Sequence, residues 1–274
     1  MRYKFRKPYR VKRRKSIWKN RFFWFSILSL IILGGLFYLF LFSEIFQIKN
    51  IVVTGEKKVS KDEINLIVEG ELEKKLLFSK SKNIFLVNSN KIREKILNKL
   101  PQIEEIEINQ GLPDTLNLVV IERKEIGCFC RRTPPTHHPP AEAGPYCFFF
   151  DKKGIIFEKV LQSCPLDLVI KDLKEGELIL GENIIEENLL STIKEIQQKI
   201  KENIETSISE FNILEEKLVV KTTENWEIYF NPEKDINWQL TQLELLLESK
   251  IPPEKRGNLE YIDLRFSKIF WKFR

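Results

Sequence analysis

The sequence predicts an α+β protein: one N-terminal transmembrane helix, a β-α-α-β-β domain, and a sheet-rich domain with helices on one face. Three observations support this prediction. Residues 22–42 contain no charged residue. In 46–124, short strand-like apolar runs flank two stretches with helical periodicity. In 125–274, most apolar runs have the length and β-branched or aromatic content of strands, and two amphipathic helical stretches interrupt them.

Residues 22–42 indicate a membrane anchor, and residues 1–21 indicate its orientation. A helix over 22–42 would be about 31 Å long, which matches the hydrocarbon thickness of a bilayer. The alternatives are a buried core helix or a cleaved signal peptide, but Ser43-Glu44-Ile45 is a poor cleavage site. The tail holds eleven Lys and Arg residues and no acid. We therefore expect a cytoplasmic tail at the cell membrane, with the bulk of the chain on the outer side.

The formal net charge of +6 suggests nucleic-acid binding only while the tail is counted. The tail holds 11 of the 45 Lys and Arg residues, which leaves 34 against 39 Asp and Glu in the external part. A solvated tail facing anionic lipid explains its basic residues more simply. We expect no nucleic-acid partner.

Residues 46–124 predict one small domain, because two amphipathic helical stretches lie between strand-like runs. The expected elements are a strand at 46–54, a helix from the capping-box pattern Ser60-Lys-Asp-Glu63, a loop at 71–83, a helix from Asn88 that Pro101 ends, and strands at 103–109 and 115–122.

Residues 125–274 predict a second domain with a proline-rich insert at 131–145. The 13 residues 133–145 contain five prolines, which exclude regular structure, so we expect an exposed loop within a hairpin. The expected elements are hairpin strands at 126–131 and 146–151, strands at 155–157 and 168–170, a helix at 184–202, strands at 208–214, 217–222 and 226–230, a helix at 235–249, and strands at 259–265 and 268–273.

Four cysteines lie on the external side, where thiols are oxidised: Cys128, Cys130, Cys147 and Cys164. We favour disulfides, and the sequence does not choose among the three pairings. A zinc site formed by these thiols with His137 or His138 is the alternative, but the CxC spacing is poor for structural zinc. Unpaired thiols are the third possibility.

The sequence offers little for catalysis. The only histidines, His137 and His138, are adjacent in the proline-rich loop, where nothing rigid orients them as bases. Gly176 and Gly181 have the spacing of a phosphate loop, but Glu182 follows where a lysine is needed. We expect no enzyme activity, no metal, no cofactor and no small-molecule substrate.

The segment from Lys268 to Phe273 is the strongest candidate for partner binding. As the last strand it is expected at a sheet edge, where unpaired backbone groups accept a strand from another protein. Aromatic side chains supply much of the energy of interfaces. The alternative is that these side chains merely cover the core. The candidate partner-binding residues are Arg265, Phe266, Ile269, Phe270, Trp271 and Phe273.

Two sets of motifs resemble a known family. The first set resembles the POTRA (polypeptide-transport-associated) domain: Ile51-Val-Val-Thr-Gly55, Ser60 with Glu63-Ile64, Asn83-Ile-Phe-Leu86, Pro101, Pro113-x-Thr115-Leu116 and Glu122-Arg123-Lys124. The second set, Gln242-Leu-x-x-Leu-Leu and Tyr261-Ile-Asp263-Leu-Arg265-Phe266, is similar to the end of the β domain in the FtsQ/DivIB family. The chain departs from the family at Asn231, where glycine is frequent, and in its four cysteines.

The resemblance implies a bitopic cell-division protein, with 46–124 as POTRA domain and 125–274 as β domain. It further implies a divisome scaffold at the septum that helps control septal peptidoglycan synthesis, and a small bitopic coiled-coil partner bound at the end of the β domain. The alternative is a POTRA component of protein transport or outer-membrane assembly, but such proteins usually carry several POTRA domains before a transmembrane barrel.

Overall fold

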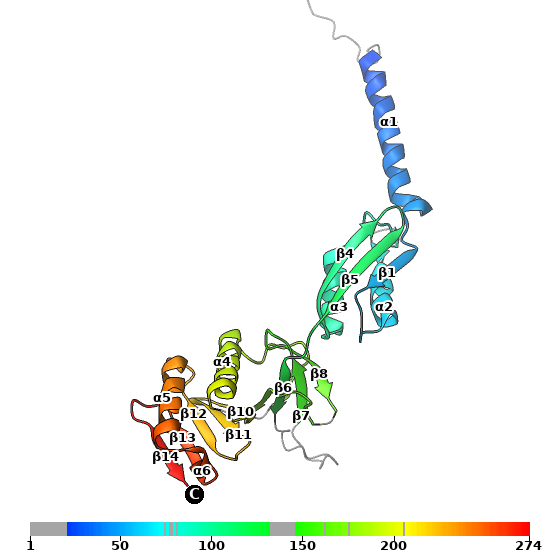
Figure 1. Ribbon diagram of the computed structural model, residues 1–274. Helices are drawn as coiled ribbons and strands as arrows, with labels where there is room; N and C mark the ends of the chain where they lie inside the picture. The colour runs from blue at the N-terminus through cyan, green and yellow to red at the C-terminus, as the bar shows by residue number, and fades with distance from the viewer. Residues whose placement is uncertain are drawn as a thin grey trace, which may run out of the picture.

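The computed structural model describes residues 21–73, 75–76, 79–80, 82–131, 146–161, 163–174, 176–204 and 206–274. Figure 1 shows an N-terminal helix followed by two folded parts, each built on its own sheet. This arrangement confirms the α+β fold class. All but the last residue of the basic tail, and all but the first of the proline-rich insert, lie outside the described residues.

Helix α1 (Arg21–Phe42) is apolar on all sides and is not covered by the rest of the protein. The segment Arg21–Leu41 is long and apolar enough to cross a membrane. An exposed apolar helix of this length is explained by lipid rather than by a protein core. A short 3₁₀ turn (Glu44–Phe46) connects α1 to the first sheet.

The first sheet has the order β1-β5-β4. Strand β1 (Asn50–Thr54) runs parallel to β5 (Thr115–Glu122), which runs antiparallel to β4 (Ile103–Gly111). Helices α2 (Lys61–Leu72) and α3 (Ser89–Lys99) contribute the other half of its core. Each helix begins at a side-chain cap, because Ser60 accepts the Asp62 N–H and Asn88 accepts the Lys91 N–H.

Two sequence-based expectations for this part need correction. The strand expected at 46–54 begins only at Asn50, because Phe46 lies in the 3₁₀ turn and the backbone of Gln47 and Ile48 pairs with residues 82–83 instead. The loop expected at 71–83 holds the end of α2 and a small hairpin of β2 (Lys75–Leu76) and β3 (Ser79–Lys80). The sequence there is polar and lacks the apolar alternation by which a half-buried strand is recognised.

The second sheet has nine strands in the order β14-β13-β12-β11-β10-β9-β6-β7-β8. Helices α4 (Glu187–Asn203) and α5 (Ile236–Ser249) bury their apolar faces in its core, around the fully buried Trp226. A short helix, α6 (Pro253–Arg256), precedes the last two strands. The strands are β6 (Gly127–Arg131), β7 (Tyr146–Phe150), β8 (Ile156–Val160), β9 (Val169–Asp172), β10 (Ile208–Leu214), β11 (Lys217–Thr222), β12 (Glu227–Phe230), β13 (Leu259–Asp263) and β14 (Phe270–Phe273).

The expected elements of this part are present, with shifted ends. The helix expected from residue 184 begins at Glu187, because the preceding backbone is used in pairing: Ile155 bridges to Asn183, and the Ile184 N–H donates to the Gly154 carbonyl. Arg131, the first residue of the predicted insert, belongs to β6. The last strand begins at Phe270 rather than Lys268.

The two sheets are joined by a short charged segment centred on Arg123. Its backbone N–H donates to the Gln102 carbonyl, and its Nε donates to the Pro101 carbonyl at 2.9 Å. The guanidinium pairs with Asp151, in the turn between β7 and β8. One Asp151 oxygen also accepts the N–H groups of Lys153 and Ile155. Arg123 therefore ties the end of the first sheet to a turn of the second.

Candidate functional site: the β14 edge

Strand β14 forms one edge of the nine-stranded sheet, and all four of its residues are exposed. Within the described residues it pairs with β13 alone, in antiparallel register from Asp263–Phe270 to Leu259–Phe273. The expected edge position of the last strand is therefore observed (Figure 1). Because neighbouring residues of a strand turn their backbone groups to alternate sides, part of the β14 backbone faces away from the sheet.

The opposite edge of the same sheet is less open. Strand β8 begins beside the segment that precedes α4, and two backbone hydrogen bonds join them: Ile156 N–H to the Glu182 carbonyl and Gly181 N–H to the Ile156 carbonyl. An edge covered by a loop is protected from further pairing. The β14 edge has no such cover in the described part of the chain.

One face of β14 continues the surface near the end of α5. Trp271 stands opposite the buried Ile262, and Phe273 stands opposite the buried Leu259. The ammonium of Lys250, at the C-terminal end of α5, lies 5.2 Å from the centre of the Trp271 ring. Both aromatic side chains continue the apolar face formed by these buried residues, but they remain partly exposed to solvent. This face therefore carries two large, partly exposed aromatic side chains.

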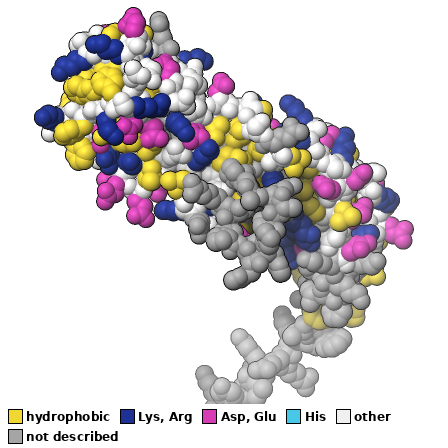
Figure 2. All heavy atoms as spheres, turned by 90° about the horizontal axis from the view of Figure 1, so that it is seen from below, with side chains coloured by type: hydrophobic (Ala, Val, Ile, Leu, Met, Phe, Trp, Pro, Cys, Tyr) yellow, Lys and Arg dark blue, Asp and Glu magenta, His cyan; other side chains and the backbone are white. Residues whose placement is uncertain are grey.

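The other face of β14 carries a second aromatic pair. Phe270 stands opposite Asp263, and its ring meets the Phe266 ring edge-on with centroids 6.2 Å apart. The Arg265 guanidinium lies 5.1 Å from the Phe266 ring centre. Figure 2 shows hydrophobic side chains gathered at the end of the molecule that carries the C-terminal strands, with Lys, Arg, Asp and Glu around them.

Arg265 fixes the turn that leads into β14. The Asp263 carboxylate accepts hydrogen bonds from the Arg265 backbone N–H, from Nε at 2.9 Å and from a terminal nitrogen at 2.8 Å. Burial opposes ionisation of Asp263, but these hydrogen bonds outweigh it and lower the pKa of the carboxyl group below its usual value. Lys234 donates to the Arg265 carbonyl. Arg265 thus positions the edge, and its charge is already paired.

The six candidate residues therefore have different surroundings. Phe266, Phe270, Trp271 and Phe273 form the exposed aromatic set, whereas Ile269 packs against the core. Sequence reasoning missed Lys250 and the exposed ion pair of Lys272 with Glu260, at 2.7 Å. The Lys250–Trp271 and Lys272–Glu260 contacts each join residues far apart in the sequence, so no local sequence pattern predicts them.

The cysteines are paired as Cys128–Cys164 and Cys130–Cys147. The first disulfide ties β6 to the segment before β9, and the second joins directly opposed residues of β6 and β7. All four sulfur atoms are engaged, which leaves no thiolate for the zinc alternative. Among the residues that the structure describes, no three or more His, Cys, Asp or Glu side chains lie close enough together to bind a metal ion. His137 and His138 lie outside those residues.

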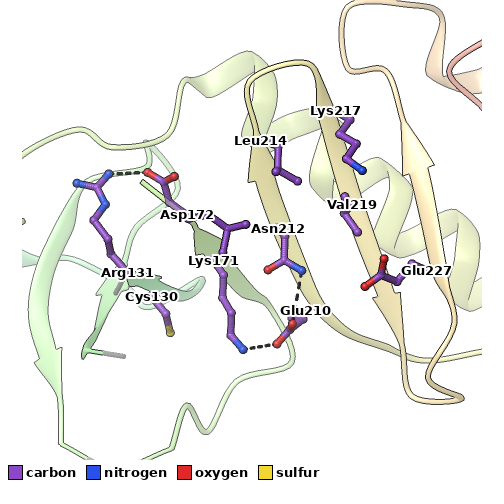
Figure 3. A pocket seen from close by; sticks show the side chains of 11 residues that line it. Cys130, Arg131, Lys171, Asp172, Glu210, Asn212, Leu214, Lys217, Val219 and Glu227 are labelled. Atoms are coloured by element: carbon purple, nitrogen blue, oxygen red, sulfur yellow. Dashed lines mark hydrogen bonds and ion pairs between the residues drawn. The ribbon is translucent and has the colours of Figure 1, made fainter. Parts of the chain in front are cut away.

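A hollow of about 520 Å³ lies on the second sheet, between β6 and β12 (Figure 3). Four of its charged side chains form two ion pairs: Arg131 contacts Asp172 at 2.6 Å, and Lys171 pairs with Glu210, which also accepts a hydrogen bond from Asn212. Burial of Glu210 opposes its ionisation, but Lys171 lowers the pKa of the carboxyl group overall. These four charged side chains are therefore engaged with one another across β6, β9 and β10.

Comparisons with known proteins agree with this architecture. Residues 46–123 match the family model described as "POTRA domain, FtsQ-type". The chain is also similar to the cell division protein DivIB of Clostridium acetobutylicum, with 29% identity over 136 residues. That alignment covers 48% of this chain and 46% of the relative, so the chain matches about half of the relative's length.

The domain match and the similarity to DivIB together support the FtsQ/DivIB family for this chain. The FtsQ-type domain match ends at residue 123, the arginine that joins the two sheets. The first sheet with α2 and α3 is therefore an FtsQ-type POTRA domain. The nine-stranded sheet follows it and bears the β14 edge.

Proposed function

We propose that this protein is a non-enzymatic scaffold of the bacterial cell-division machinery, anchored by α1 with its basic tail in the cytoplasm. The observation that carries the proposal is the open β14 edge with its four exposed aromatic side chains. The family and the name of the relative support the division process. The exposed apolar helix supports membrane anchoring.

The β14 edge recruits a partner by strand addition. The outward backbone groups hydrogen-bond to an extended segment of the partner and supply affinity independent of sequence. Trp271 and Phe273 on one face, and Phe270 with Phe266 on the other, supply specificity through alternate side chains of the added strand. A partner that is itself anchored beside this chain binds more tightly, because both proteins are confined to one membrane.

The partner expected from the family resemblance is a small single-span division protein with a coiled coil. Its recruitment places the septal peptidoglycan machinery at the division site without any turnover by this chain. Two ion pairs in the hollow on the second sheet, Arg131–Asp172 and Lys171–Glu210, support a structural role for these four side chains.

Replacement of Trp271 by alanine tests this function against a matched control. Trp271 is 37% exposed on β14, and Trp238 is 43% exposed in the first turn of α5, at the opposite end of that helix from Lys250, which contacts Trp271. We expect Trp271→Ala to weaken co-purification of the small partner by about 30-fold in affinity, the effect of a ~2 kcal/mol hot spot. We expect Trp238→Ala to leave the partner bound. Equal retention of the partner by both variants would contradict strand addition at this edge.

The process itself is tested by the position of a fluorescent fusion on the N-terminal tail. A band at midcell before constriction is expected if the chain acts in division. A uniform membrane signal throughout the division cycle would contradict the role in division, whatever the partner assay gives.

A further inference from the structure

The end of α1 is joined to the POTRA domain by a buried side chain. Asn83 Nδ2 donates to the carbonyls of Phe40 and Leu41, at 2.8 and 2.9 Å. Its Oδ1 accepts the Phe85 N–H at 2.9 Å. The last carbonyls of a helix lack partners within the helix, so Asn83 supplies a cap from 43 residues away in the sequence.

Aromatic packing strengthens the same joint. The rings of Phe40, Phe46 and Phe85 contact one another, with centroids 5.2 to 6.1 Å apart. The Ile84 N–H donates to the Phe46 carbonyl, so the backbone of the two segments is also linked. The helix and the domain therefore meet through hydrogen bonds and stacked rings rather than through a free linker.

The length of α1 fixes the level of this joint in the membrane. The apolar segment Arg21–Leu41 has 21 residues, about 31 Å of helix, so all of it is needed to cross a hydrocarbon core of about 30 Å. Phe40 and Leu41 therefore lie at the outer boundary of the hydrocarbon. Because Asn83 hydrogen-bonds to both carbonyls, the residues that follow it in the sequence lie near the same membrane boundary.

Those neighbours present apolar side chains to the outside. Ile45, Phe85 and Leu86 are all exposed. So is Leu112, in the β4–β5 turn, whose Asp114 carbonyl accepts the N–H of Lys49, seven residues beyond the end of α1. Figure 1 shows this turn at the end of the POTRA domain nearest α1.

We propose that this end of the POTRA domain is a lipid-binding surface formed by Ile45, Phe85, Leu86 and Leu112. The surface is continuous with the membrane-spanning helix and inserts its side chains into the boundary between head groups and acyl chains. Exposed Lys49, beside it, favours anionic head groups. The Asn83 cap keeps the surface in place, so the domain stands on the membrane in one orientation. This inference does not depend on partner binding at β14.

Depth-dependent quenching in vesicles tests the proposal with two matched positions. Leu86 is 39% exposed, and Ile121 is 47% exposed near the other end of β5. About 20 Å of strand separates Ile121 from Thr115, where β5 leaves the β4–β5 turn. Leu86→Cys and Ile121→Cys are made in the full chain and labelled with an environment-sensitive fluorophore without reductant, so that both disulfides stay closed. The proteins are placed in vesicles of phosphatidylcholine and phosphatidylglycerol that contain spin-labelled lipid.

We expect the spin-labelled lipid to quench the label at Leu86 several-fold more than the label at Ile121, and iodide in the buffer to do the reverse. Equal quenching of both labels by iodide would overturn the proposal. A label at Leu86 that neither iodide nor spin-labelled lipid quenches would also overturn it, because a protein surface would then be the occupant.

A pair of Asn→Asp variants tests the cap. Asn83→Asp keeps an acceptor for Phe85 but replaces the amide donor with an oxygen that repels the carbonyls of α1. Asn88→Asp is the control, because Asn88 acts only as the acceptor that caps α3. We expect lipid quenching at Leu86 to fall in the first variant and to stay unchanged in the second. Unchanged quenching in both would overturn the positioning role of Asn83, while the comparison of Leu86 with Ile121 still decides the lipid contact.

Discussion

Replacement of Asp151 by asparagine is expected to loosen the joint between the two sheets. The side chains of Asp151 and Arg123 are 2% and 12% exposed, so their ion pair is largely removed from water. Asparagine keeps an oxygen for the N–H groups of Lys153 and Ile155 but leaves the guanidinium without its counter-charge. Removal of one partner of a buried ion pair costs about 3–5 kcal/mol.

Cleavage after Lys124 reports this change directly. The Arg123 N–H is bonded to the Gln102 carbonyl, so cleavage requires local opening of the joint. When opening is fast relative to cleavage, the rate follows the population of the open state. If the variant lowers the free energy of opening the joint by about 3 kcal/mol, the fragment that ends at Lys124 forms at least about 100-fold faster. Each 1.4 kcal/mol corresponds to about a factor of ten. The assay is digestion with a lysine-specific protease, read by mass spectrometry.

Glu104→Gln is the matched control for this experiment. Glu104 pairs with Lys152 at 3.0 Å and with Lys153 at 3.6 Å, but both lysine side chains are more than half exposed. Such a surface pair contributes about 0–1 kcal/mol, so cleavage should rise by less than about fivefold. A folded Asp151→Asn variant that is cleaved no faster than Glu104→Gln would refute the assignment of the Arg123–Asp151 pair as the structural joint.

Two further predictions concern the second sheet. The double variant Cys130→Ser, Cys147→Ser removes a disulfide with a sequence separation of 17 and should lower the free energy of unfolding by about 3 kcal/mol. The measurement is denaturant titration in detergent. No loss of stability would contradict a structural role for this disulfide. The pKa of Asp263 is lowered in the folded protein, so its contribution is complete above the unfolded value of about 3.9 and is lost as the pH falls toward the folded value. Amide exchange at Arg265, relative to the intrinsic rate at each pH, should therefore speed up below about pH 4 in the native protein but not in Asp263→Asn.

Local patterns predicted most of the fold. The helices are expected to begin at Ser60, Asn88 and residue 235, and these residues are the caps of α2, α3 and α5, because capping depends on residues within one turn. The spacing of apolar residues located α4, and the hairpin of β6 and β7 follows from two strand-like runs on either side of a proline-rich segment. These signals act between near neighbours in the sequence.

Contacts between distant residues could not be predicted in the same way. Asn83 meets the end of α1 across 42 and 43 residues, and Arg123 meets Asp151 across 28. The choice of Cys164 as the partner of Cys128 depends on where the chain returns after β8. A sequence pattern shows that such a side chain is polar or reactive, but only the assembled fold shows which group it meets.

The candidate site was predicted better in its position than in its details. An aromatic last strand indicated the edge, and the sheet order places β14 there. The split of its aromatic rings between two faces depends on the register with β13, which includes a bulge between Leu259 and Tyr261. The role of Arg265 as a brace for Asp263 also emerges only from the turn geometry.

The central claim is that β14 receives a strand from a partner. Hydrogen–deuterium exchange of the full chain, with and without the small single-span partner proposed above, tests this most directly. The account predicts slower exchange in Phe270–Phe273 on binding, and unchanged exchange in Ile156–Val160 at the opposite edge of the sheet. Unchanged exchange in β14, with protection elsewhere on the protein, would contradict it.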